Sequence, residues 1–268
     1  MRARAGAALL LGLGLAACGV AGAEEDAISG KERLVIGVNG DQPGVGFQKG
    51  GTFTGFDIDF AGAIASRLGK KVAFRRVTSA TRETMLQRGE VDLVVASYSV
   101  TPERKEKVLF AGPYYVAHQD ILTRRADTGI RTVRDLKGRR LCDVAGSVSY
   151  TRVTKEKSVA AISAPAPGYN DCLADLVAGR TDAVSTDDLI LAGLAASAKA
   201  PLRIVNTPLS DELYGVGLRR GDVDGCETVN KAITRLYQDG TAARLLTRWF
   251  APVGLKVTTT VPQFEGCE

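Results

Sequence analysis

The segment Leu34-Val35-Ile36-Gly37-Val38 is a short apolar run between charged and polar residues, as expected for a buried β-strand. An amphipathic stretch that ends at Gly69 follows it, and a second apolar strand covers residues 72–77. The alternation continues through a short helix closed by Gly89 to a strand over 93–96. Strands that alternate with amphipathic helices are typical of α/β domains, so we predict an α/β fold.

A second series of strands and helices begins after Thr128, with a strand over 140–144 and another over 183–185. Two amphipathic helices near the C-terminus need a sheet to cover. If they return to the first sheet, the chain crosses between the two series near 121–126 and again near 210–219. This predicts two α/β lobes joined by a two-strand hinge. Lobe 1 would comprise 33–122 and 214–268, and lobe 2 would comprise 127–209.

The N-terminus has the pattern of an export signal, with Arg2 and Arg4 before an apolar run over 5–17 that is too short to span a bilayer. The run leads into Cys18-Gly19 and resembles a bacterial lipoprotein signal, in which cleavage leaves a lipidated cysteine. The alternative is ordinary cleavage near Ala23. We therefore expect a signal peptide over 1–17, a lipidated tether over 18–32, and an extracytoplasmic protein anchored by Cys18 to the outer face of the cell membrane.

The remainder of the chain has a mild charge and no second long apolar segment. The whole sequence has 35 basic and 30 acidic residues, so loss of Arg2 and Arg4 leaves a net charge of +3. Basic side chains are not clustered with aromatic ones, which argues against nucleic-acid binding. No later stretch approaches the ~20 apolar residues of a spanning helix, so the mature chain is not itself a channel or permease.

Four cysteines remain after Cys18, an even number in a chain that we expect to be exported. Four cysteines allow three pairings. We predict the pairing in which each bridge stays within one lobe, with Cys142 bonded to Cys172 and Cys226 bonded to Cys267. A zinc site is the rival interpretation, but the sequence has no close cysteine pair and only one histidine. We expect neither a metal nor a cofactor.

The segment Ala96-Ser97-Tyr98-Ser99-Val100-Thr101-Pro102-Glu103-Arg104 leaves a predicted strand and enters a short helix with Pro102 at its start. Ligands of open α/β sheets bind beyond the carboxyl ends of strands. Ser97 offers backbone groups, Ser99 offers a hydroxyl, and Arg104 offers a rigid set of donors that suits a carboxylate. The alternative is that Thr101 caps the helix and Arg104 is a solvated charge.

Four motifs occur in an order that resembles the family 3 solute-binding proteins, the receptors of polar amino-acid ABC importers. They are Gly55-Phe56-Asp57-Ile58-Asp59, Ser97-x-Ser99-x-Thr101-Pro102-Glu103-Arg104, Gly112-Pro113-Tyr114-Tyr115 and Thr181-Asp182-Ala183-Val184. The resemblance covers roughly residues 33 to 255 and implies the type II periplasmic-binding-protein fold. It is strongest to glutamate-binding lipoproteins of Gram-positive bacteria. The segments that indicate this are Asp41-Gln42-Pro43-Gly44, Ala80-Thr81-Arg82-Glu83 and Thr186-Asp187-Asp188.

The resemblance implies a ligand site for L-glutamate or L-aspartate. In it, Arg104 and Ser99 hold the α-carboxylate and Asp187 holds the α-ammonium group. Asp188 competes with Asp187 for that role, and an aspartate at this boundary could instead cap the following helix.

The same resemblance assigns the distal carboxylate to Ser79 and Arg82, which have the Ser-x-x-Arg spacing of acidic amino-acid receptors. It adds the turn Gly146-Ser147-Val148-Ser149, whose free N–H groups face an anion. Val148 departs from the family pattern and contributes only its N–H, and Ser149 could cap the helix. Gln42 and Asn39 have a lower rank, and Phe56 and Tyr114 are expected in the core.

The resemblance also implies function and partners. We expect a non-enzymatic, monomeric binding subunit that closes over its ligand and docks on the ABC permease subunits in the membrane. The alternatives are a periplasmic dehydratase of the same fold and a sensory ligand-binding subunit.

Overall fold

The structure is a computed structural model that describes residues 27–267. The predicted signal peptide over 1–17, Cys18 and most of the predicted tether lie outside the described residues. Within the described range, no helix combines the length and the apolar composition that crossing a membrane requires.

The first half of the chain alternates strands and helices up to one long strand, β7. The elements are η1 (Ile28–Gly30), β1 (Arg33–Val38), β2 (Asp41–Gln42), β3 (Gly46–Lys49), β4 (Thr52–Thr54), α2 (Phe56–Arg67), β5 (Lys71–Arg76), α3 (Arg82–Gln87), β6 (Leu93–Val94), α4 (Pro102–Lys105) and β7 (Leu109–Arg124).

The rest of the chain forms a second α/β group and then returns through β12. The elements are η2 (Val133–Leu136), β8 (Arg140–Val144), α5 (Ser149–Thr151), the π-helical turn η3 (Arg152–Glu156), β9 (Ile162–Ala166), α6 (Tyr169–Val177), β10 (Val184–Asp187), α7 (Asp188–Ser197), β11 (Leu202–Ile204), β12 (Ser210–Leu218), α8 (Val223–Gln238), α9 (Thr241–Phe250) and η4 (Ala251–Val253).

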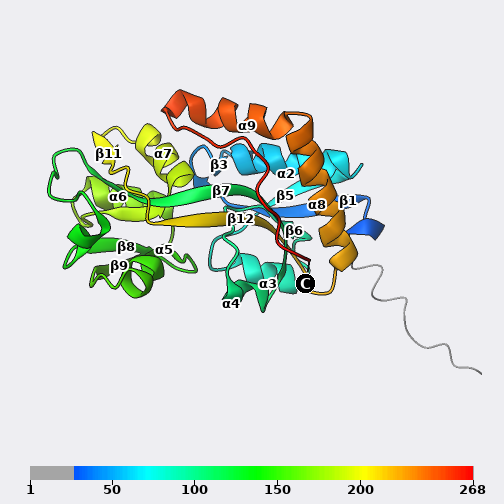
Figure 1. The fold of residues 1–268 in the computed structure, drawn as a ribbon, viewed down its shortest axis with the longest axis horizontal. Coiled ribbons are helices and arrows are strands. Elements are labelled where there is room, and N and C mark those ends of the chain that lie inside the picture. The colour runs from blue at the N-terminus through cyan, green and yellow to red at the C-terminus, as the bar shows by residue number, and fades with distance from the viewer. Residues whose placement is uncertain (1–26, 268) are drawn as a thin grey trace, which may run out of the picture.

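The two long strands β7 and β12 run side by side through the middle of the molecule and connect its two halves (Figure 1). The main sheet has the order β10-β7-β12-β6-β1-β5, and β11 also pairs with β7. The first half contains β1, β5 and β6 with α2, α3, α4, α8 and α9. The second half contains β8 to β11 with α5, α6 and α7. This is the predicted fold of two α/β lobes joined by two strands.

The lobe boundaries themselves stay a prediction. By Gln119, β7 already pairs with β10 of the second half, three residues before the predicted end of lobe 1 at 122.

At the N-terminus, the packed chain begins earlier than Arg33, where the predicted tether ends and lobe 1 starts. Ile28 is 3% exposed and its N–H donates to Asp222 Oδ2 at 3.0 Å. Part of the predicted tether is therefore packed, because Ile28 is an apolar residue that the end of α8 covers.

Apolar packing fixes the first half around a large cluster of aromatic rings. Phe56, Phe60 and Tyr114 are fully buried, and the rings of Phe60 and Tyr114 stack at 5.1 Å between centroids. Tyr214 on β12 continues the cluster towards the hinge strands. Phe56 and Tyr114 thus lie in the core, as expected, and the aromatic cluster reaches the middle of β12 at Tyr214.

Both predicted disulfides are confirmed. Cys142 of β8 is bonded to Cys172 of α6, and Cys226 of α8 is bonded to Cys267 of the tail, with Cα–Cα distances of 5.7 and 5.9 Å. Each bridge therefore joins elements of the same half. The bridges close loops with sequence separations of 30 and 41 residues. Each bridge adds about 3 to 4 kcal/mol to the free energy of unfolding, because it restricts the unfolded chain.

Candidate functional site

A small cavity lies between the two halves, beside the hinge strands. All eight residues that the sequence assigns to the ligand line it, together with four others. The lining residues are Gln42, Ser79, Arg82, Ser97, Ser99 and Arg104 from the first half and Ser147, Val148, Ser149, Tyr169, Asp187 and Ile190 from the second. Most of them follow the carboxyl ends of strands, where short loops present side chains and free backbone groups.

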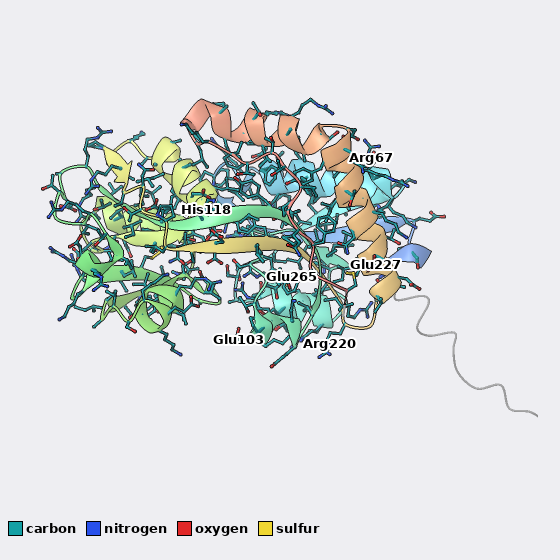
Figure 2. All side chains as sticks on the ribbon, in the orientation of Figure 1. Arg67, Glu103, His118, Arg220, Glu227 and Glu265 are labelled. Atoms are coloured by element: carbon teal, nitrogen blue, oxygen red, sulfur yellow. A yellow bond between two sulfur atoms is a disulfide. The ribbon has the colours of Figure 1, made fainter. Side chains whose placement is uncertain are left out.

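Arg104 of α4 is buried in the wall of this cavity. Arg104 is 5% exposed, whereas its neighbour Glu103 points into solvent at the edge of the molecule (Figure 2). Nη1 donates to the Ser99 carbonyl at 2.7 Å, and Nη2 donates across the cleft to the Gly146 carbonyl at 3.0 Å. Nε lies 3.7 Å from Glu83. The alternative of a solvated helix charge is therefore wrong. Thr101 does cap the helix, with its hydroxyl accepting from the Arg104 N–H.

Arg82 of α3 is 2% exposed and only partly satisfied. Nη1 donates to the Ala96 carbonyl at 2.9 Å, but Nε is buried without a hydrogen-bond partner. Among the residues that the structure describes, no carboxylate lies within ion-pair distance of this guanidinium. A buried cation without a counterion is costly, so the guanidinium of Arg82 has an unmet need for an acceptor or a negative charge.

The ring of Tyr98 lies under both arginines. The guanidinium carbon of Arg82 is 4.0 Å from the ring centroid and that of Arg104 is 5.0 Å from it. The ring stabilises the two cations by cation–π interaction but adds no negative charge. Burial, and then the proximity of Arg104, lower the pKa of Arg82 to about 10, so both side chains stay charged at neutral pH. The site therefore presents two adjacent positive charges.

Among the described residues that line the cavity, Asp187 at the end of β10 supplies the one carboxylate. It is the N-cap residue of α7, yet its side chain makes no capping hydrogen bond and instead accepts from the Tyr214 hydroxyl at 2.6 Å. Asp188 faces elsewhere, because its carboxylate accepts from the N–H groups of His118 and Leu189. Of the two aspartates, only Asp187 is placed to meet a ligand. Burial, and then the charge of Glu212, raise the pKa of Asp187 to about 8.

The turn before α5 contributes hydroxyl groups to the opposite wall. Ser147 Oγ accepts from the Ser149 N–H at 3.2 Å and lies 3.1 Å from the Tyr169 hydroxyl. Ser149 Oγ donates to Thr186 at 3.2 Å, and Thr186 donates to Tyr169 at 2.9 Å. These contacts hold the turn rigidly. Val148 is the N-cap residue of α5 and makes no side-chain capping bond, so Ser149 is not the cap.

Of the backbone groups that Ser97 was expected to offer, the N–H is already used within the protein. That N–H donates at 2.8 Å to Oδ2 of Asp57, a fully buried carboxylate, and Ser97 adopts a positive φ of 42°. Its hydroxyl donates to Gln42 Oε1 at 2.9 Å. Asn39, which the sequence ranked low, donates to the Ala96 carbonyl at 3.1 Å and supports the loop. The N–H of Ser97 is thus occupied within the protein.

Sequence reasoning missed two residues of the cavity wall and gave Gln42 a low rank. Tyr169 begins α6 directly after a strand, and that junction was a signal for a site residue. Ile190 lies in an apolar run of α7, where nothing in the pattern distinguishes it from a core residue.

Comparison with known proteins gives consistent matches over most of the chain. The model of the bacterial extracellular solute-binding proteins, family 3, matches residues 34–252. The glutamate-binding protein GluB of Corynebacterium glutamicum is 35% identical over 90% of this chain and 87% of its own length. The glutamine-binding protein GlnH of the Bacillus subtilis ABC transporter is 32% identical over 88% of this chain and 91% of its own length. The structure of an ancestral arginine-binding protein bound to arginine has a TM-score of 0.77 at 34% identity, and covers 82% of this chain and 99% of its own.

Proposed function

Because this chain belongs to the bacterial extracellular solute-binding proteins of family 3, we propose that it binds an acidic amino acid for an ABC importer. The observation that carries the proposal is the set of charges in the cavity wall: two buried arginines and one buried aspartate. L-Glutamate and L-aspartate carry two carboxylates and one ammonium group. Each charge of such a ligand therefore meets one opposite charge of the site.

Arg104 and Ser99 hold the α-carboxylate, and Asp187 holds the ammonium group. Arg82 holds the distal carboxylate with Ser79 and the turn at Ser147 and Val148. The free Nε of Arg82 supports this assignment, because a carboxylate accepts from a guanidinium through two parallel bonds. The similar proteins include glutamate-, glutamine- and arginine-binding proteins, so the preference for an acid rests on Arg82.

The titration panel that tests the proposal uses L-glutamate, L-aspartate, L-glutamine and L-asparagine, with heat and product measured separately. We expect saturable heat with one ligand per chain for the acids, and unchanged ligand after incubation. Release of a new product would instead indicate a dehydratase of this fold. Absence of binding by all four would refute the proposal.

The proposal includes closing of the two lobes over the ligand. Lobe 1 comprises 33–122 and 214–268, and lobe 2 comprises 127–209. Two contacts between the halves depend on glycines of the second half. Tyr169 N–H donates to Asp41 Oδ2 at 2.7 Å, and a Cβ on Gly168 would lie 2.1 Å from the same oxygen. A Cβ on Gly193 would lie 1.7 Å from the carbonyl oxygen of Pro43. The closed arrangement therefore requires that the backbone of α7 at Gly193 lies directly against the backbone at Pro43.

Gly193→Ala is expected to weaken binding of every amino acid alike, by about tenfold or more, because the added methyl group prevents full closure. Its thermal unfolding without ligand should be close to that of the unmodified protein. X-ray scattering with saturating L-glutamate should show a larger radius of gyration than the unmodified protein has. Gly62→Ala is the control, since its Cβ would meet nothing within 4 Å. Normal affinity and full closure in Gly193→Ala would contradict this part of the proposal.

Binding is expected to release protons near neutral pH. The pKa of Asp187 is about 8 in the empty site, so its carboxyl is mostly protonated at pH 7. The ligand's ammonium group favours the carboxylate, so the proton leaves, and affinity rises between pH 6 and pH 8 by up to about tenfold per pH unit. Calorimetry at pH 7 in two buffers of different ionisation enthalpy measures this release. Identical heats in both buffers would show that Asp187 is already ionised.

We also propose that lipidation of Cys18 anchors the protein at the outer face of the cell membrane, where it delivers its ligand to the permease as a monomer. The family is extracellular, which agrees with this location.

A further inference from the structure

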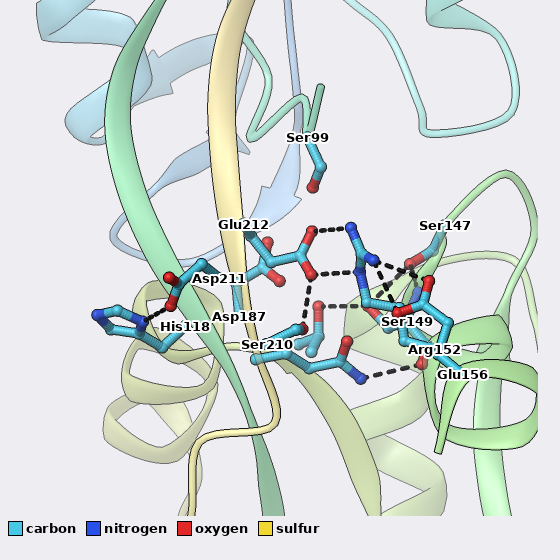
Figure 3. Close-up of polar contacts among 12 residues, drawn as sticks. Ser99, His118, Ser147, Ser149, Arg152, Glu156, Asp187, Ser210, Asp211 and Glu212 are labelled. Carbon is cyan, nitrogen blue, oxygen red and sulfur yellow. Dashed lines mark hydrogen bonds and ion pairs between the residues drawn. The ribbon is translucent and has the colours of Figure 1, made fainter. Parts of the chain in front are cut away.

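A buried ion pair joins the second half of the molecule to the hinge next to the ammonium site (Figure 3). Glu212 of β12 is 1% exposed, and its carboxylate accepts from Arg152 Nη2 at 3.1 Å and from Ser210 Oγ at 2.9 Å. Arg152 Nε contacts the same carboxylate. The other side of the guanidinium donates to Glu156, which is exposed at the surface.

Glu212 lies beside Asp187. Glu212 and Tyr214 are two residues apart on β12 and are both buried, so their side chains share one face of the strand. Tyr214 donates its hydroxyl to Asp187, and Gln119 of β7 pairs with Asp187 on one side and with Ser210 on the other. The hinge thus places two buried carboxylates near the position of a single ligand ammonium group.

Two uncompensated carboxylates would not match one ammonium group. Each would disfavour the ionised form of the other, and the extra charge would also act on Arg104. Arg152 partly offsets the charge of Glu212 by direct contact. Other titratable groups also lie around Asp187. They are the hydroxyls of Tyr214 and Tyr169, Asp188 with its two N–H donors, and His118 and Asp120 of β7, which act on Asp188.

We propose that Arg152 is a positioning residue of the ammonium site: by offsetting the charge of Glu212, it favours Asp187 as the carboxylate that receives the ligand's ammonium group. The inference rests on the proposed function in that the ligand carries this group. Gln119 Nε2 also donates to the Ser149 carbonyl, at 2.9 Å, so the turn before α5 keeps a second link to the hinge without Arg152. The charge of Arg152 is therefore separable from its role in holding the turn.

The first test follows the Asp187 carboxyl by carbon-13 NMR in the ligand-free protein, with Asp187→Asn to assign its signal. Arg152→Met should raise the titration midpoint of Asp187, because Glu212 then lacks its counterion. Glu212→Gln should lower it, and Arg152→Met with Glu212→Gln should return it close to the unmodified value. Lys157→Met removes an exposed charge that follows the same helical turn and should change nothing. An unchanged midpoint in Arg152→Met would overturn the proposal.

The second test measures L-glutamate and L-glutamine affinity from pH 6 to pH 9. Arg152→Met should weaken both ligands at pH 7, by about tenfold for each unit by which the midpoint rises, and the loss should shrink at higher pH. Arg152→Lys and the double variant should regain most of the affinity. A loss that is the same at every pH and persists in the double variant would show a purely structural role. If the unmodified protein binds neither ligand, the proposed function fails, while the NMR titration still decides the inference.

Discussion

Arg104→Ala is expected to abolish measurable binding of every amino acid while the fold survives. The side chain is buried against the cavity, and without it a ligand α-carboxylate would be desolvated without its charge-assisted partner. Such truncations cost about 2 to 5 kcal/mol, or roughly thirty- to several-thousand-fold in affinity. The variant also loses the bond from Nη2 to the Gly146 carbonyl, which joins the two halves. Both effects act in the same direction.

Isothermal calorimetry with L-glutamate and L-glutamine measures this loss, and thermal unfolding shows whether the fold survives. Arg88→Ala is the matched control, because that side chain is 71% exposed and belongs to the same half. It should bind normally. Near-normal glutamate affinity in Arg104→Ala would remove the α-carboxylate clamp from this account.

Arg82→Gln is expected to change selectivity rather than binding in general. In the unmodified protein the distal amide of glutamine places its NH2 against donors and leaves Arg82 without a countercharge in a closed site. This mismatch should cost about 2 to 4 kcal/mol, which makes glutamate roughly thirty- to a thousandfold tighter than glutamine. The variant lacks the positive charge that favours the acid. The difference in affinity between glutamate and glutamine should therefore become smaller, mainly because glutamate binds more weakly.

Two ligands and two variants give four affinities that separate the roles of the arginines. Arg104→Ala should weaken glutamate and glutamine alike, because every amino acid has an α-carboxylate. Arg82→Gln should weaken glutamate much more than glutamine. Equal losses for the two ligands in the Arg82 variant would show that this arginine does not read the side chain, and the preference for an acid would then lose its structural support.

Local patterns in the sequence were sufficient for the strands and helices, whereas most residues of the cavity wall were expected from the family resemblance. The apolar run over 34–38 and the glycines that end helices predict strands and helices because burial and backbone geometry act over a few residues. The cavity residues Ser99 and Arg104 follow the end of a predicted strand, and parallel strands end at one edge of a sheet. Knowing the strands was therefore enough to expect these residues together.

What the sequence did not reveal depends on contacts between distant segments. The partnership of Arg152 with Glu212 spans 60 residues and follows from the registers of β7 and β12, which no local pattern encodes. The close approach of Gly193 to Pro43 likewise exists only when the two halves meet. Ser97 was expected to offer backbone groups, and of these the N–H donates to Asp57, a buried residue 40 positions earlier in the chain.

The most direct test of the central claim is a crystal structure of the complex with L-glutamate. We predict that the α-carboxylate accepts from Arg104, that the ammonium group donates to Asp187, and that the distal carboxylate lies within hydrogen-bond distance of Arg82 Nε, the buried atom that now lacks a partner. A complex in which Arg82 makes no contact with the ligand, or in which the distal carboxylate points to the solvent, would contradict the account.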